Sequence, residues 1–97
     1  MPAYFMVDIL EITDEDKMEE YRSNVVATVA RYGGTYRVLG GQFEVVEGDW
    51  NPTFPVMIEF PTMEKLKEWY NSKEYGDIKE LRLDGTQSNA VFFEGLP

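Results

Sequence analysis

The sequence contains neither histidine nor cysteine, and these two absences exclude many classes of protein. Without histidine there is no imidazole base, no histidine-supported nucleophile and no histidine ligand for haem or zinc. Without cysteine there is no disulfide, which agrees with a reducing compartment, and we expect a cytoplasmic location. We also expect no signal peptide, because the first residues lack its basic and long apolar regions.

Positive charge and long apolar runs are also scarce. The 97 residues carry 18 acidic and 9 basic side chains, which gives a formal net charge of −9. Such a chain repels phosphate backbones and anionic lipids at long range, and no stretch approaches the ~20 apolar residues that span a bilayer. We therefore expect neither nucleic acid nor a membrane as a partner.

The residues that are present predict one domain, residues 1–97, with alternating strands and helices. The predicted elements are a strand at 3–12, a helix at 14–32, strands at 35–39, 43–48 and 56–61, a helix from 62 that breaks at 71–72 and resumes to 85, and a strand at 89–96. Taken in order, they predict an α+β fold of the split βαβ type. In this fold two helices cover one face of a four-stranded antiparallel sheet.

Capping residues and glycines mark the ends of several elements. Thr13 precedes three acidic residues and is the predicted N-cap of the first helix, which ends at Gly33-Gly34. Gly40-Gly41 lies between two strand-like pieces and leaves two interpretations open. The pair could close a two-residue hairpin or mark a bulge within one long strand.

The strands are apolar at both alternating positions, as in Val56, Met57 and Ile58. A sheet with one face in water would alternate apolar and polar residues, so the face without helices also needs a cover. The simplest cover for a short chain is a second copy of itself. We therefore expect a homodimer formed through the sheet face, with Trp50 anchoring either its own loop or the dimer seam.

Two carboxylates, Asp8 and Glu59, lie within apolar strands that the split βαβ order makes neighbours. If the two face each other, burial and like charge would raise a pKa and supply a general acid or base. The structural alternative is that each carboxylate pairs with an arginine or points to a rim.

Arginines and aromatic residues supply the other candidates. Arg37 and Arg82 could clamp a carboxylate or enolate, or could neutralise the two carboxylates. The aromatic residues could line a pocket between sheet and helices or fill the core. The catalytic candidates are Glu59, Arg37 and Tyr75, and the ligand-binding candidates are Trp69, Arg82, Tyr36 and Asp8, with Tyr21 as a further lining residue. We expect Glu59, Arg37, Arg82, Trp69 and Tyr75 to converge on one concavity.

The glycine pairs match neither dinucleotide-binding nor phosphate-binding loops, and no acidic spacing matches a known metal loop. We therefore expect no cofactor and no metal.

As a set, several short motifs resemble the bacterial domain-of-unknown-function family numbered 1330. They are Tyr21-Arg22, Tyr32-Gly33-Gly34, Arg37, Gly40-Gly41, Glu47-Gly48-Asp49-Trp50, Glu59-Phe60-Pro61, Trp69-Tyr70, Ser72, Tyr75, Arg82 and Glu94-Gly95. The resemblance implies a ferredoxin-like subunit of a dimeric α/β barrel, an architecture shared with small monooxygenases, haem-degrading enzymes, muconolactone isomerases and chlorite dismutases. It implies no assigned activity. Where a basic residue is expected before the last strand, this chain has Thr86-Gln87-Ser88.

Two functions from different classes agree with these residues. The first is the binding of a small organic molecule in a pocket between sheet and helices. Whether cofactor-free acid–base or oxygen chemistry accompanies this binding stays open. The second is a non-catalytic homodimeric module whose polar residues are structural. A closed, dry interface between sheet and helices would favour the second.

Overall fold

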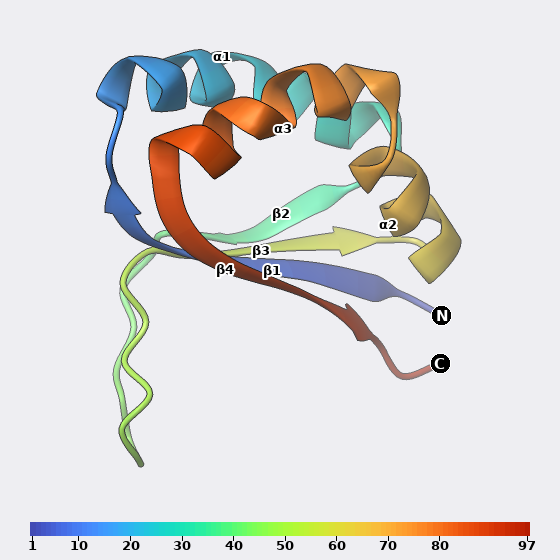
Figure 1. Ribbon diagram of the computed structural model, residues 1–97. Helices are drawn as coiled ribbons and strands as arrows, with labels where there is room; N and C mark the ends of the chain where they lie inside the picture. Colours follow the sequence, from blue (N-terminus) through green and yellow to red (C-terminus); the bar gives the residue numbers. More distant parts are fainter.

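The computed structural model describes residues 1–97 as two layers, with helices packed over one face of an antiparallel sheet (Figure 1). The elements are β1 (Ala3–Ile12), α1 (Glu15–Arg31), β2 (Thr35–Leu39), β3 (Pro55–Phe60), α2 (Met63–Tyr70), α3 (Lys73–Gly85) and β4 (Thr86–Glu94). The strand order is β2-β3-β1-β4, so the predicted split βαβ fold is confirmed. None of the helices is both long and apolar enough to cross a bilayer.

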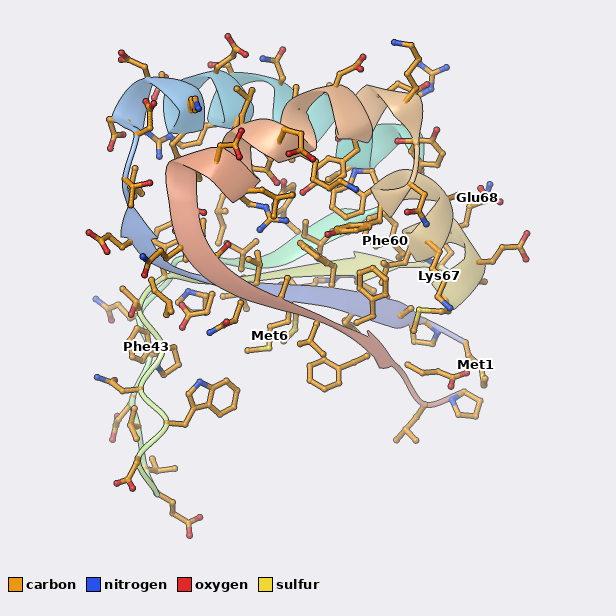
Figure 2. All side chains as sticks on the ribbon, in the orientation of Figure 1. Met1, Met6, Phe43, Phe60, Lys67 and Glu68 are labelled. Carbon is orange, nitrogen blue, oxygen red and sulfur yellow. The ribbon has the colours of Figure 1, made fainter.

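Strand alternation separates the two faces of the sheet. In β3, Val56, Ile58 and Phe60 are buried toward the helices, while Met57 and Glu59 lie on the other face. Figure 2 shows the same division, with Phe60 on the helix side of the sheet and Met6 on the side without helices. The core therefore lies in the layer between the sheet and the helices.

The predicted N-cap of α1 is wrong, and the predicted glycine turn at its C-terminal end is confirmed. The N-cap is Asp14 and not Thr13, because the Asp14 carboxylate accepts from the backbone N–H of Lys17 at 3.2 Å. At the other end the N–H groups of Gly33 and Gly34 donate to the carbonyls of Ala30 and Val29. Gly33 has a φ of +80°, so it makes the left-handed turn that the glycine pair predicts.

The strand β2 contains a bulge, but it lies before Gly40-Gly41, and the glycine pair forms neither that bulge nor a two-residue hairpin. Its pairing with β3 shifts register between Tyr36 and Val38, while Gly40 ends the strand with a φ of +61°. Because a bulge adds one residue, Tyr36 and Leu39 both reach the helix side although they are three positions apart.

The predicted strand at 43–48 is wrong. Residues 41–54 form an arm that projects beyond the face of the sheet without helices (Figure 1), and no backbone hydrogen bonds join its two limbs. These residues have strand-like composition but no neighbouring strand to pair with. The base of the arm is held by Asp8, whose carboxylate accepts from the backbone N–H of Thr53 at 2.9 Å and of Phe54 at 2.7 Å.

Candidate functional site

A cavity of about 630 Å³ lies between α1 and the sheet. Of its 18 lining residues 14 are hydrophobic, so its wall is largely apolar. The main contributions are Phe5, Val7 and Ile9 from β1, Val56 and Ile58 from β3, Tyr36 and Leu39 from β2, and Met18, Tyr21 and Val25 from α1. The helix side of the sheet and the buried stripe of α1 thus form its two walls.

The mouth of this cavity lies where β1 and β2 end and α1 passes over them. Leu10, Val26 and Leu39 line the cavity and are 43%, 55% and 61% exposed. Two charged residues, Glu11 and Arg22, share this rim. Arg22 is already paired there with Glu15 and Glu19, so its charge is neutralised at the surface.

Arg82 is the charged group in the interior of the cavity. It lies in the last turn of α3, and its side chain is only 2% exposed. Its Nη1 donates to the hydroxyl of Ser88 at 3.0 Å, while Nε and Nη2 are covered by protein and make no hydrogen bond of ordinary geometry, although the hydroxyls of Tyr21 and Tyr75 lie close by. Unpaired buried donors are uncommon in proteins, because each one loses its hydration without replacement.

The hydroxyls of Tyr21 and Tyr75 lie close to this guanidinium. The hydroxyl oxygens of Tyr21 and Tyr75 are 2.8 Å apart and share one hydrogen bond. Burial, followed by the neighbouring Tyr75, raises the pKa of Tyr21 far above its ordinary value, and burial raises the pKa of Tyr36 to about 12. The hydroxyls of Tyr21 and Tyr36 therefore stay protonated at neutral pH and act as hydrogen-bond donors or acceptors, not as bases.

The charge of Arg82 is likewise fixed at neutral pH. Burial lowers the pKa of Arg82, but the Tyr75 and Tyr21 hydroxyls raise it, with a net increase. The wall of the cavity therefore includes a residue with a permanent positive charge, whose Nε and Nη2 are covered by protein.

Trp69 lies behind the cavity and not along its wall. It is fully buried, its Nε1 donates to the hydroxyl of Thr28 at 3.0 Å, and its ring centroid is 4.0 Å from that of Tyr75. Tyr75 is also fully buried and does not line the cavity, but its hydroxyl contacts that of Tyr21 and lies close to Arg82. Both residues therefore support the wall as core side chains.

The candidates from the strands lie elsewhere. Arg37 Nε and Glu59 Oε1 are 3.2 Å apart on the face of the sheet without helices, which separates them from Arg82 by the sheet itself. The prediction that Glu59, Arg37, Arg82, Trp69 and Tyr75 converge is therefore wrong. Glu59 shares its strand parity with Met57, and this parity turns it away from the helices.

Asp8 and Glu59 do not face each other. In the sheet Glu59 lies opposite Tyr4, and Asp8 lies opposite Pro55, four positions along β1. Asp8 uses its carboxylate to hold the arm, and Glu59 pairs with Arg37, as the structural alternative anticipated. The structure brings together no group of three or more acidic side chains that could hold a metal ion.

Sequence reasoning missed Ser88 as the partner of Arg82 and the contribution of Met18 and Val25 to the wall. The signals were present: Met18 and Val25 follow the helical spacing of the buried face of α1. Arg82 itself lies seven residues after Tyr75, on the buried face of α3. That placement indicated burial, but it did not show whether a carboxylate would lie nearby.

Solved structures of similar fold come from several bacteria. A protein of unknown function from Rhodopseudomonas palustris superposes with a TM-score of 0.77 at 16% identity, covering 99% of this chain and 83% of its own. A dimeric ferredoxin-like protein of unknown function from Jannaschia sp. CCS1 gives 0.75 at 12% identity over 98% and 100%. SnoaB, a cofactor-independent oxygenase from Streptomyces nogalater, gives 0.69 at 10% identity over 99% and 94%. At these identities the likeness shows the ferredoxin-like fold alone.

The sequence itself matches one family model. Residues 2–96 match the model described as "Domain of unknown function (DUF1330)". A search of the curated proteins found no match.

Proposed function

The chain belongs to the family of the domain of unknown function DUF1330, and we propose that this protein binds a small, largely apolar organic molecule in the cavity between α1 and the sheet. The observation that carries the proposal is the cavity itself. Its volume of about 630 Å³ lies within the roughly 300–1,000 Å³ that small-molecule pockets occupy. Its apolar wall with a few polar groups has the composition of such pockets.

The cavity also argues against the non-catalytic alternative. In a purely structural module the layer between sheet and helices would be packed to the density of a protein interior, because unfilled apolar volume lowers stability. Asp8, Glu59 and Trp69 do have structural partners and need no ligand. Arg82 has two donors without a partner, so the structural explanation does not extend to it.

Cofactor-free oxygen chemistry is a second candidate, and the observation that favours it is the buried charge of Arg82. A fixed cation in an apolar site would stabilise an enolate or phenolate, and such electron-rich anions are the forms of organic molecules that dioxygen oxidises most readily. SnoaB, of similar fold, is described as a cofactor-independent oxygenase. Acid–base chemistry is less supported, because Glu11, the only carboxylate in the lining, is an exposed residue at the rim.

Binding is tested with a panel of small apolar molecules, both neutral and anionic, by thermal shift at neutral pH. We expect some of them to raise the melting temperature of the wild-type protein and not that of Val25→Phe, whose larger side chain fills the cavity. Leu83→Phe is the matched control, because Leu83 lies on the exposed face of α3, 47% exposed. The proposal fails if nothing binds or if Val25→Phe responds like the wild type.

The second candidate is tested by oxygen uptake with naphthols and 1,3-diketones. Catalysis predicts uptake that rises with protein concentration and that Arg82→Met loses. If oxygen uptake equals that of the buffer while the ligand still binds, the protein binds its ligand without catalysing oxidation.

We further propose that the protein forms a homodimer through the face of the sheet without helices. Val91 and Phe93 are 44% and 48% exposed there, and with Met6 they line a hollow that Trp50 of the arm, 68% exposed, also borders. Exposed apolar groups gathered on one face are typical of an interface. The similar structure from Jannaschia is described as dimeric, which supports the proposal. A cytoplasmic location stays a prediction from composition.

A further inference from the structure

We infer that the arm, residues 41–54, packs against a second copy of the chain and forms part of the dimer interface. The inference rests on the homodimer proposed above and adds to it a contact surface that the face of the sheet does not include. Each protomer would thus be held both at its sheet and by the arm of its partner.

The arm has apolar side chains and backbone groups that nothing within the protomer covers. Phe43, Val45, Val46 and Trp50 are all exposed to solvent. Over residues 41–52 no backbone group forms a hydrogen bond with another backbone group of the chain. A segment rich in valine and aromatic residues whose backbone is unpaired has the character of a strand that lacks its neighbour. Exposed apolar groups gathered in one place are typical of an interface.

The arm also has a defined direction relative to the sheet. The carboxylate of Asp8 accepts from the backbone N–H groups of Thr53 and Phe54, which fixes the base of the arm to β1. From this base the arm projects beyond the face of the sheet without helices (Figure 1). Trp50 borders the hollow that Phe93 lines on that face. The arm and the sheet face therefore form the two sides of a corner, and a molecule seated on the sheet face would also meet the arm.

The length of the arm indicates that it would reach past the sheet of a partner. Gly48, with a φ of +79°, reverses the chain near the middle of the arm. Each limb then has about six residues and spans up to roughly 20 Å when extended, whereas two sheets packed face to face lie about 10 Å apart. A second copy on the sheet face would therefore lie alongside the arm. Two-fold symmetry would repeat this contact, so both arms would be covered.

The charges of the arm argue for a protein as its partner. The arm carries Glu44, Glu47 and Asp49 and no basic residue, so anionic lipids and phosphate backbones would be repelled from it. In an extended limb Phe43 and Val45 share one side, and Glu44 points to the other. The two apolar side chains can therefore pack against a partner while the carboxylate stays in water.

The first test measures dimer dissociation in arm variants, by sedimentation velocity over a dilution series. Phe43→Ser/Val45→Ser should raise the dissociation constant of the dimer at least about tenfold, because both arms lose their apolar contacts. Val26→Ser/Leu83→Ser is the matched control. It removes two apolar side chains of similar exposure from the helices and should change the constant less than about threefold.

A cross-linking measurement keeps the proposal testable if the arm variant does not fold. Because the chain has no cysteine, Val46→Cys creates a single attachment point for a benzophenone cross-linker on the arm. In a mixture of isotope-labelled and unlabelled protein, illumination should join one chain to another. The same label at Leu83→Cys, on the exposed face of α3, should not join two chains.

The outcomes separate this inference from the proposed dimer. If the wild-type protein is a dimer, an unchanged dissociation constant in Phe43→Ser/Val45→Ser would overturn the inference and leave a dimer held by the sheet face alone. Absence of cross-linked chains from Val46→Cys would overturn it as well. A wild-type protein that is monomeric would overturn the proposed dimer together with the inference, and the arm would then be a surface for a partner of another kind.

Discussion

Arg82 is buried with fewer hydrogen-bond partners than its guanidinium can use, which lowers the stability of the protein in the absence of a ligand. A fully buried guanidinium with two unpaired donors is a feature that a core selected for stability alone would replace with an apolar side chain. Functional sites often retain such unfavourable groups, which the remainder of the fold must offset.

Replacing Arg82 should therefore stabilise the protein in the absence of ligand. We expect Arg82→Met to raise the free energy of unfolding by about 1–3 kcal/mol, the cost of leaving buried polar groups unsatisfied. Urea denaturation at pH 7 measures the difference, with Arg31→Met as the exposed control expected to change it by less than about 0.5 kcal/mol. A clear destabilisation in Arg82→Met would mean that the protein itself already satisfies the guanidinium.

Tyr36, which lines the cavity, makes the free energy of unfolding of the protein depend on pH. Its pKa is about 12 in the folded protein, because of burial, and close to the ordinary value of 10.0 when unfolded. The folded state therefore holds its proton more tightly, and stability that is present below pH 10 is lost as the pH rises through the folded pKa. Between pH 9 and 11 we expect the free energy of unfolding to fall by on the order of 1 kcal/mol from Tyr36 alone.

Urea denaturation of wild type and Tyr36→Phe across this pH range tests the expectation. The fall should be smaller in Tyr36→Phe, because phenylalanine has no proton to lose. Parallel curves for the two proteins would show that Tyr36 ionises normally in the folded state.

For individual residues, the sequence identified the candidates for the site but not the groups with which they interact. Arg82 and Tyr36 stood out as polar residues among apolar ones, and both line the cavity. Glu59 and Arg37 stood out for the same reason, yet they pair with each other on the opposite face. Which face a strand residue occupies depends on register and bulges, and these follow from pairing with distant strands.

Among the elements, α1 depends on the glycines at its end for two different reasons. Gly33 has a φ of +80°, which a β-branched residue resists, while a Cβ on Gly34 would meet Val29 Cγ1 at 2.6 Å and Phe60 Cε1 at 2.8 Å. We expect Gly33→Val and Gly34→Val each to lower the free energy of unfolding by more than about 1 kcal/mol.

Gly76→Ala is the matched control for these substitutions. Gly76 lies inside α3, and a Cβ added there would meet no atom within 4 Å, so alanine should raise stability by up to about 1 kcal/mol. Thermal or urea unfolding of the three variants distinguishes these effects. Unchanged midpoints in both valine variants would contradict the assignment of the helix end.

Helix ends were predictable to within a residue because their signals are local, with Asp14 in place of Thr13 at the start of α1, whereas the arm was not predictable. The C-terminal glycines of α1 and the N-cap Thr62 of α2 act within a few residues of themselves. Residues 43–48 have the composition of a strand, but a strand also needs a partner, and the structure gives them none within the chain. The role of Asp8 in holding the arm depends on a contact 45 positions away, which no local pattern reveals.

For the whole molecule, the open question is what covers the second face of the sheet. The exposed Val91, Phe93 and Trp50 predict self-association. Sedimentation equilibrium at micromolar concentration should give about twice the chain mass of 11.2 kDa. A stable, folded monomer at that concentration would contradict the proposed dimer.

The overall fold was predictable because the order of strands and helices restricts a chain of this size to few topologies. The sequence left open whether the layer between sheet and helices holds a pocket or a filled core, because an unfilled volume arises from how side chains of several elements meet and not from any one segment. Helical and strand periodicity show which residues face the core, but they do not show whether those residues fill it.

Ligand binding in the cavity between α1 and the sheet is tested most directly by a methyl NMR titration of the wild-type protein with octanoate. A ligand in the cavity between α1 and the sheet should produce saturable shifts at the methyl groups of Met18, Val25 and Ile58, with Val46 and Leu96 unaffected. Val46 and Leu96 are 80% and 87% exposed and lie outside the cavity lining, so they report non-specific contact. Shifts confined to such exposed methyl groups, or no saturable shifts at all, would contradict ligand binding in the cavity.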